Sequence, residues 1–315
     1  MIRWVGIDEA GYGPNLGPLV MTAVVAEGPG AEPPDVWRDL AATVCRSGED
    51  TRRLWIDDSK RLYRAGEGLP RLEAASLAVL DAAGRPWPAS VGGWFSAFEA
   101  GTLEEVELTP WLEGLFPLVG PRAGTWAVVP KGPLRGARWR ITAVRSVVVG
   151  PARFNRELER SGSKARVHFG AFARLLAWLW ALAADGIETR VGSDKHGGRH
   201  YYLDLLYEAF PDAWIDRGSE GAELSRYTLR DRSRRLELRL FPRADAQDGL
   251  VALASIVSKM LRERWMTVFN AYWTSRLAGL APTAGYPGDA ARFRAAIEPH
   301  CAARGLDPSV WWRAK

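Results

Sequence analysis

Apolar and polar residues alternate along this chain with two different periods, which predicts strands interleaved with helices. Residues 2–7 and 19–25 are short apolar runs on either side of a glycine-rich segment, so we expect them to pair as a hairpin. Two further strands are predicted over residues 138–149 and 187–192. Strands that alternate with helices along the chain indicate an α/β fold.

Helical periodicity marks the segments between these strands. Leucine and alanine recur at intervals of three and four over residues 69–84 and 167–184, and a third helix is predicted to begin near Asp245 and to pass Met266. A shorter helix is predicted over residues 202–210. Period-two alternation over residues 223–241, around an Asp-Arg-Ser-Arg turn, predicts a basic β-hairpin.

Composition narrows the class of protein. With 315 residues, 47% of them hydrophobic, the chain can bury one large core or a core with a smaller appended unit. Lysine and arginine outnumber aspartate and glutamate by 42 to 37, which suits a polyanionic partner without requiring one. Only Cys45 and Cys301 are present, so we expect no disulfide framework or cysteine-rich zinc site.

The same features predict a soluble cytoplasmic protein. Residues 1–11 lack the basic start, apolar core and cleavage site of a signal peptide. The richest uncharged apolar run, residues 175–184, is about half the length of roughly 20 residues that crosses a bilayer. Two distant cysteines fit a reducing compartment.

Four carboxylates stand at the ends of predicted elements. Asp8 and Glu9 follow the first strand, Asp194 follows a later strand, and Asp245 begins the long helix. Carboxylates gathered at one edge repel one another unless a cation neutralises them, and all-oxygen ligands favour Mg²⁺ or Mn²⁺ over zinc. Two such ions about 4 Å apart can promote hydrolysis of a phosphodiester, so the pattern predicts metal-assisted hydrolysis.

Each carboxylate also has a plainer structural interpretation. Asp245, with Asp248 three residues later, resembles a helix cap, and Asp194 before a glycine pair resembles a turn residue. Asp8 favours function more strongly, because charge at the end of an apolar strand has no packing role. Successive side chains in a strand face opposite sides, so Glu9 can join Asp8 only if the chain has already begun to turn.

Three blocks of sequence, in order, resemble the motifs of the ribonuclease HII family. Residues 6–20 (GIDEAGYGPNLGPLV) resemble its opening Asp-Glu signature, and residues 58–62 (DSKRL) resemble its Asp-Ser-Lys motif. Residues 245–262, which contain ASIVSK, have the spacing from the family's last catalytic aspartate to its following helix. A weaker match, residues 285–287 (GYP), resembles the family's glycine-tyrosine turn.

The resemblance implies a ribonuclease H-like fold, a mixed central sheet flanked by helices. It also implies dependence on two Mg²⁺ or Mn²⁺ ions, and hydrolysis of the RNA strand of RNA/DNA hybrids or cleavage at ribonucleotides embedded in DNA. Position by position, it implies that the catalytic metal ligands are Asp8, Glu9, Asp194 and Asp245. It further implies that the turn of Gly11, Tyr12 and Gly13 reads the ribose 2′-hydroxyl and that Tyr286 stacks on the neighbouring deoxyribose. It places Lys60 and Lys259 near the backbone phosphates.

Departures from the family pattern qualify these expectations. Tyr12 replaces an arginine, which removes a cation from the turn that reads the junction. The basic, glycine-rich loop after Asp194 is either a solvated turn or a loop that grips phosphate or moves protons, with His196 able to titrate near neutrality. The accessory candidates are Lys195, His196, Arg199 and Asp248.

The spacing from Asp194 to Asp245 is longer than in the family. We therefore expect one domain over residues 1–315, with insertions at about 85–136 and 200–241 and a helical extension at about 268–315. The hairpin arginines either extend a nucleic-acid groove or serve solubility: Arg226, Arg230, Arg232, Arg234 and Arg235. The 15 tryptophans, including Trp311 and Trp312, fit packing better than base stacking.

The leading hypothesis is a monomeric endonuclease whose partner is an RNA/DNA hybrid or ribonucleotide-containing duplex, with no membrane involved. A structure-specific DNA nuclease on the same fold is the second hypothesis, because Tyr12 alters the turn that reads ribose. A non-catalytic nucleic-acid-binding protein is the third. All four candidate carboxylates argue against it, since a pure binder gains nothing by directing acids at phosphates.

Overall fold

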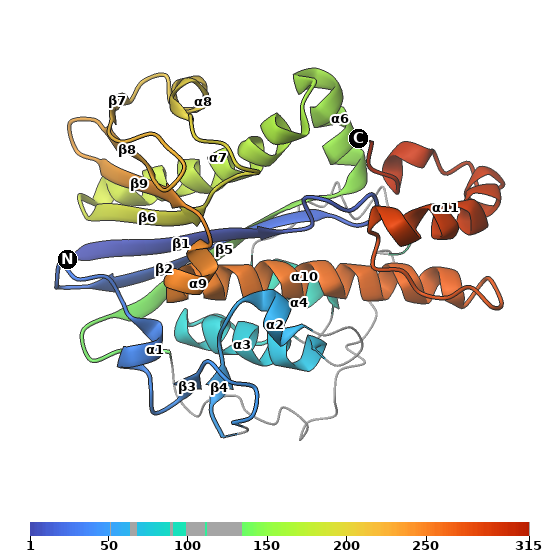
Figure 1. Cartoon of the computed structure of the whole chain (residues 1–315), viewed down its shortest axis with the longest axis horizontal. Helices are drawn as coiled ribbons and strands as arrows, with labels where there is room; N and C mark the ends of the chain where they lie inside the picture. Colours follow the sequence, from blue (N-terminus) through green and yellow to red (C-terminus); the bar gives the residue numbers. More distant parts are fainter. Residues whose placement is uncertain (51, 64–67, 89–90, 99–110, 112–133, 315) are drawn as a thin grey trace.

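The computed structural model describes residues 1–50, 52–63, 68–88, 91–98, 111 and 134–314 (Figure 1). Most of the predicted insertion at 85–136 lies outside the described residues. Its described part includes a helix, α4, whose Trp94 is fully buried in the core.

Seven strands form one mixed sheet in the order β5-β2-β1-β6-β9-β8-β7. The strands are β1 (Ile2–Ala10), β2 (Leu19–Gly28), β5 (Arg140–Val149), β6 (Glu188–Asp194), β7 (Trp214–Arg217), β8 (Ser225–Arg230) and β9 (Arg235–Phe241). β1 runs antiparallel to β2 and parallel to β6, and β9 continues the parallel part next to β6. The strands β3 (Val44–Cys45) and β4 (Leu54–Trp55) form a separate small ribbon.

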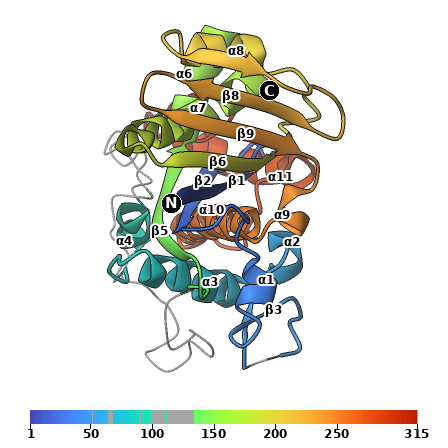
Figure 2. The same cartoon turned by 90° about the vertical axis from the view of Figure 1, so that its left-hand side faces the viewer.

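Helices flank both faces of this sheet, with α6, α7 and α8 on one side and α3, α4 and α10 on the other (Figures 1 and 2). The helices are α1 (Val36–Asp39), α2 (Ser59–Leu62), α3 (Leu69–Ala82), α4 (Val91–Ala97), α6 (Pro151–Ser161), α7 (Lys164–Leu182), α8 (Leu203–Ala209), α9 (Ala244–Gln247), α10 (Gly249–Thr274) and α11 (Pro287–Ala302), with the 3-10 turns η1 (Ala183–Asp185) and η2 (Pro308–Val310). The predicted fold class, a mixed central sheet flanked by helices, is confirmed.

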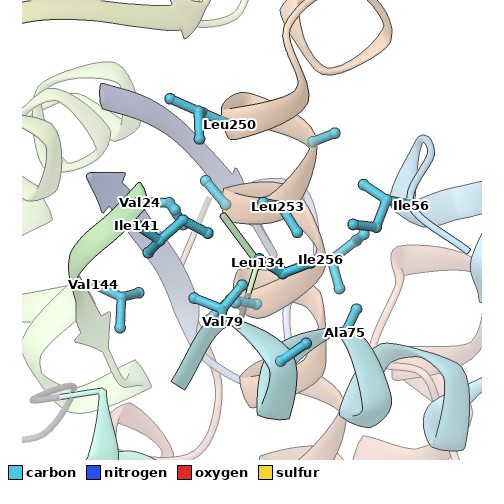
Figure 3. Packing of buried hydrophobic residues seen from close by; sticks show 14 of the residues in the cluster. Val24, Ile56, Ala75, Val79, Leu134, Ile141, Val144, Leu250, Leu253 and Ile256 are labelled. Atoms are coloured by element: carbon cyan, nitrogen blue, oxygen red, sulfur yellow. The ribbon is translucent and has the colours of Figure 1, made fainter. Parts of the chain in front are cut away.

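The long helix α10 lies directly against β1 and β2. A Cβ added at Gly6 would lie 2.2 Å from the backbone of Leu250, so only glycine allows this close approach. Figure 3 shows Leu253 and Ile256 of α10 between Val24 of β2 and Val79 of α3. Burial of each such side chain contributes about 1.5–3 kcal/mol, which fixes α10 and the residues it presents to the sheet edge.

The helix α7 packs on the opposite face of the sheet. By length and composition alone, residues Lys164–Asp185 could cross a membrane, and they are the one such helix among the described residues. Half of the most apolar window is buried inside the protein, and Phe172, Leu175 and Leu179 join β1, β2 and β9 in one core cluster. These contacts are those of a core helix.

The structure corrects two details of the predicted elements. β1 continues to Ala10, and Asp194 is the last residue of β6, so Asp8, Glu9 and Asp194 lie within strands and not after them. The helix predicted from Asp245 is divided into α9 and α10.

The segment at 200–241, which we expect to be an insertion relative to the family, supplies strands to the main sheet. β9 pairs in parallel with β6, and β8 and β7 extend the sheet beyond it. The basic hairpin is therefore part of the sheet, with Arg226 and Arg239 toward the edge where Asp194 lies and Arg230 and Arg235 toward the opposite edge.

Candidate active site

The carboxyl ends of the parallel strands place the candidate carboxylates at one edge of the sheet. Ile7 of β1 lies opposite Ser193 of β6, so Asp8 and Asp194, the next residues, lie side by side along that edge. Asp245 joins them from α9, which follows β9 at the same edge. The backbone N–H of Arg243, just before α9, donates to Asp194 Oδ1 at 3.1 Å and fixes the start of α9 beside β6.

Asp8 and Glu9 leave β1 on opposite faces. Asp8 is 8% exposed and faces α10, where Ser255 hydrogen-bonds its carboxylate. Glu9 faces α7, where its Oε1 lies 3.4 Å from Nε2 of His168. The chain does not turn until after Ala10, so the pair approaches the sheet edge from two sides.

Burial and mutual repulsion determine the charge state of this edge. Burial raises the pKa of Asp8 well above its ordinary value, and the neighbouring carboxylates of Glu9 and Asp245 raise it further. Burial also raises the pKa of Asp194 and of Asp245, with repulsion from Asp245 and Glu9 acting on Asp194 and repulsion from Asp58 acting on Asp245. The structure thus brings together acids that are costly to ionise without a nearby cation.

Glu9 differs from the other three carboxylates. Burial acts to raise its pKa, but the contact with His168 and the charge of Lys60 outweigh burial, and the pKa of Glu9 is lowered. Glu9 is therefore the member of the group that His168 and Lys60 keep ionised.

The donor chemistry of this edge fits a hard divalent cation, because all four side chains offer carboxylate oxygens. Across the described ranges, however, no three His, Cys, Asp or Glu side chains are arranged to hold a metal ion. The carboxylates share one edge without forming a complete ligand set. The side chains that would hold Mg²⁺ or Mn²⁺ are Asp8, Glu9, Asp194 and Asp245.

The turn after β1 contains two glycines with different structural roles. Gly11 has φ +86°, and a Cβ there would lie 2.3 Å from the carbonyl oxygen of Pro18, so folding alone requires glycine. Gly13 has ordinary backbone geometry, and a Cβ there would meet nothing within 4 Å. The missing side chain at Gly13 has no packing explanation and leaves the backbone open to a ligand.

Tyr12, between these glycines, packs inward. Its ring lies edge-on to His168, with the centroids 4.8 Å apart, and it is partly buried against the α7 side of the core. The guanidinium of Arg313 donates to the carbonyl oxygens of Gly11 and Tyr12, which holds the turn from the opposite end of the chain.

Tyr286 lies next to this turn and is 47% exposed. The carbonyl of Gly285 accepts hydrogen bonds from the N–H groups of Asn15 and Leu16, at 2.9 and 3.2 Å. The guanidinium carbon of Arg262 lies 5.5 Å from the centroid of the Tyr286 ring. These contacts bring residue 286 beside residues 15–16 and leave about half of the Tyr286 side chain exposed.

The two candidate lysines lie in different environments. Lys60 is exposed, and its charge acts to lower the pKa of both Glu9 and Asp245, so it faces the carboxylate edge. Lys259 is ion-paired with Glu263 at 2.7 Å, and its ammonium lies 4.5 Å from the centroid of the Tyr63 ring. Lys60 is thus the lysine better placed to meet a phosphate.

The loop after Asp194 is held by protein contacts. Lys195 Nζ donates to the Gly221 carbonyl at 2.6 Å and to Ser225 Oγ at 2.8 Å, so this loop is tied to the hairpin segment. The guanidinium of Arg199 faces the Tyr202 ring. Asp248 accepts from the N–H groups of Leu250 and Val251 and caps α10.

His196 does not behave as predicted. It is 8% exposed and lies between the rings of His168, Phe172 and Tyr202. Burial lowers the pKa of His196 well below its ordinary value, and the adjacent His168 and Arg199 act in the same direction. The prediction that His196 titrates near neutrality is wrong, because a buried imidazole resists protonation.

Sequence reasoning missed two residues of this region. His168 is the polar side chain of α7 that faces Glu9, and a single histidine on the buried face of an apolar helix was its only signal. Arg313 gives no local signal, because its partners are about 300 residues away.

Comparison with known proteins gives structural matches alone. No protein-family model matches the sequence, and no curated protein matches it significantly. Ribonuclease HII of Archaeoglobus fulgidus, solved with PCNA, is 16% identical with a TM-score of 0.41, over 100% of this chain and 95% of that one. Bst-RNase HIII, solved with Mn²⁺, is 16% identical with a TM-score of 0.49, over 99% of this chain and 66% of that one. Ribonuclease H2 of Pyrococcus horikoshii is 15% identical with a TM-score of 0.40, over 98% of this chain and 92% of that one.

These matches span nearly the whole chain at low sequence identity, so any activity of this protein has to rest on its own residues. These matching solved structures are ribonucleases HII and HIII, each with a TM-score below 0.5.

Proposed function

We propose that this protein is a metal-dependent endonuclease that hydrolyses the RNA strand of RNA/DNA hybrids or cleaves at ribonucleotides embedded in DNA. The observation that carries the proposal is the gathering of Asp8, Asp194 and Asp245 at one sheet edge, each with a raised pKa. Structural acids do not need to share an edge at such an electrostatic cost, whereas ligands of divalent cations do.

The residues of the site have separate roles in this proposal. The four carboxylates would hold two Mg²⁺ or Mn²⁺ ions, which would supply a Lewis acid able to lower the pKa of water and stabilise a leaving oxygen. Asp8 and Asp194 are held in fixed positions by neighbouring parallel strands. The open backbone at Gly13 offers its amide to a ribose 2′-hydroxyl, and the exposed Tyr286 ring offers a flat face to a sugar.

The test is cleavage of matched duplexes in Mg²⁺, in Mn²⁺ and in EDTA. The substrates are a DNA duplex with one ribonucleotide, a longer RNA/DNA hybrid, and the same sequence as plain DNA. We expect Asp8→Asn to reduce cleavage of the ribonucleotide-containing duplexes about 100-fold or more, because one ligand contributes several kcal/mol. Asp81→Asn, which changes an exposed carboxylate at the end of α3, is the matched control. Folded wild-type protein that cleaves neither ribonucleotide-containing duplex in either metal would refute the proposal.

A structure-specific DNA nuclease is the second candidate. It is favoured by Tyr12, whose ring packs on His168 and leaves the turn without the cation expected there. Branched all-DNA substrates in the same assay separate the two, because preferential cleavage of these would identify the second candidate.

Calorimetric titration with Mn²⁺ tests the non-catalytic alternative, which predicts no binding at millimolar metal. A monomer in the cytoplasm remains our prediction for its state and location.

A further inference from the structure

One face of the sheet carries arginines in place of a covering helix. Along β8 and β9, Tyr227, Leu229, Leu236, Leu238 and Leu240 point into the core beneath α7. The alternate side chains point away from α7, and four of them are exposed arginines: Arg226, Arg230, Arg235 and Arg239. We call these four residues the arginine face. Figure 2 shows β9 and β8 toward the viewer with no described helix in front of them.

Strand register brings these like charges directly opposite one another. Arg226 of β8 pairs with Arg239 of β9, and Arg230 pairs with Arg235. Like charges at opposed positions of an antiparallel pair destabilise a sheet unless other groups neutralise them. The arrangement therefore has a cost in the free protein that a bound polyanion would remove.

Two of the four arginines form close ion pairs with neighbouring carboxylates. Glu237 pairs with Arg226 at 3.0 Å, and Asp216 pairs with Arg230 at 2.7 Å. Among the described residues, Arg235 and Arg239 form no close ion pair, although the charge of Arg235 lowers the pKa of Asp216 and that of Arg239 acts to lower the pKa of Asp248. Arg235 is the first residue of β9, and Arg239 lies two residues before its end.

The arginine face continues directly from the carboxylate edge. Asp194 pairs with Phe241, which is two residues beyond Arg239 on the same face of β9. Arg235 lies four residues before Arg239, which corresponds to about 13 Å along a strand. A hollow of about 280 Å³ lies beside Arg239, and its charged lining consists of the arginines Arg190, Arg226 and Arg239 and the acids Glu237 and Asp248. A strand of nucleic acid that reaches Asp194 could thus continue over these cations.

We propose that the arginine face binds the phosphate backbone of the duplex on one side of the scissile bond. The proposal rests on the proposed function for the identity of that duplex. Contacts to phosphates, and not to bases, follow from the side chains present, because the exposed aromatic ring nearest these arginines, Trp214, lies on the outermost strand with the guanidinium of Arg230 5.4 Å from its centroid. Such contacts add affinity without sequence selectivity.

The structure also divides the arginines of the hairpin into two groups. Arg234 pairs with Asp231 and lies over the ring of Trp180 on α7, and so it belongs to the other side of the sheet. Arg239, which was not among the five arginines singled out in the sequence, replaces it beside Arg226.

The test measures binding of a fluorescent RNA/DNA hybrid in EDTA, by anisotropy, at a series of salt concentrations. Changing both unpaired arginines, Arg235→Gln with Arg239→Gln, should raise Kd about 10-fold at 0.1 M salt and reduce the slope of log Kd against log salt by about 2. The matched control removes two exposed arginines elsewhere, Arg52→Gln with Arg160→Gln, and should leave the slope unchanged. Arg235→Lys with Arg239→Lys should retain most of the affinity, because phosphate contacts depend mainly on charge.

An equal change of Kd and slope in the glutamine double variant and in the control would overturn the proposal. So would tighter binding of an acidic protein than of the hybrid in the same assay. Cleavage in Mn²⁺ is measured separately on the same hybrid. If the salt slope depends on Arg235 and Arg239 but the hybrid is not cleaved, the proposed binding by the arginine face is supported and the proposed function fails. If the hybrid is cleaved but the salt slope does not depend on these two arginines, the proposed function is supported and binding by the arginine face fails.

Discussion

His168 illustrates how a single side chain can adjust one carboxylate of a group. The other three candidate ligands have raised pKa values, whereas the pKa of Glu9 is lowered by its contact with His168 and by Lys60. His168 is almost fully buried and makes ring contacts with Tyr12 and His196 on either side. It therefore fixes both the direction and the charge of Glu9, as a positioning residue that does not itself reach the sheet edge.

We predict that His168→Ala lowers kcat for hybrid cleavage about 10-fold and changes KM little, because outer partners of metal ligands orient them without contacting substrate. His168→Gln keeps an N–H donor at this position and should recover part of the loss. Steady-state kinetics on the ribonucleotide-containing duplex provides both values. If kcat falls equally in the two variants and in proportion to the fall in their melting temperatures, His168 has only a packing role.

For single residues, the sequence identified candidate site residues where the signal lies in neighbouring positions of the chain. The Asp-Glu pair, the glycine turn and Asp245 could be singled out because their neighbours in sequence form recognisable blocks. The convergence of their carboxyl groups on shared metal ions stays a prediction. His168 and Arg313 could not be assigned partners, because Glu9 and Gly11 reach them only through tertiary folding.

Among the elements, the break between α9 and α10 settles which aspartate caps the long helix. Asp248 has extended backbone geometry, and its Oδ1 accepts from the N–H groups of Leu250 at 2.8 Å and Val251 at 3.3 Å. Asp245 lies in the first turn of α9, and no hydrogen bond from its side chain caps that helix. The cap that the sequence offered for Asp245 is therefore supplied by Asp248, and metal binding by Asp245 stays a prediction.

We predict that Asp248→Ala lowers the free energy of unfolding by about 1–2 kcal/mol, because two backbone donors at the start of α10 lose their acceptor. Asp248→Asn keeps a side-chain oxygen and should cost much less. Asp245→Ala should change stability by less than about 0.5 kcal/mol, since it removes a repelled carboxylate and no cap. Urea unfolding of the three variants is the measurement, and a larger loss for Asp245→Ala than for Asp248→Ala would contradict this assignment.

Periodicity predicted individual strands and helices well, including the β1–β2 hairpin and α7. It did not predict that β9 sits beside β6 in the main sheet. Strand pairing between residues about 45 apart depends on the topology of the whole sheet, and the apolar alternation of β9 is compatible with an isolated hairpin as well.

Across the whole molecule, Arg3 joins β1 to two other parts of the chain. Its guanidinium lies 2.7 Å from Glu27 on β2 and 2.7 Å from Asp185 in η1, at the end of the sheet away from the carboxylate site. The hydrogen bond from Arg3 lowers the pKa of Asp185. Because ionised Asp185 is favoured in the folded state, its contribution to stability is present above the unfolded pKa of about 4 and is lost as pH falls through the lower folded pKa.

We predict that Asp185→Asn has a melting temperature about 1–3 °C below wild type at pH 6–7. The effect is small because the carboxylate is 45% exposed and solvent screens the pair. The difference should shrink as pH falls below about 4 and disappear once pH is below the lowered pKa of Asp185 in the folded protein, where wild type is protonated too. Calorimetric scans of both proteins over this range provide the test, and a difference that grows as pH falls would contradict the assigned sign.

The hydrogen bonds from Arg313 to the turn at residues 11–13 also determine when this turn becomes ordered during translation. The strand that carries Asp8 leaves the ribosome first, whereas the guanidinium that fixes the carbonyls of Gly11 and Tyr12 leaves about 300 residues later. The turn should therefore stay unprotected in a nascent chain, and become ordered only when translation has passed residue 313. Amide exchange at Gly13 in a chain ended at residue 312, compared with the full chain, would reveal this delay as a loss of protection confined to the turn.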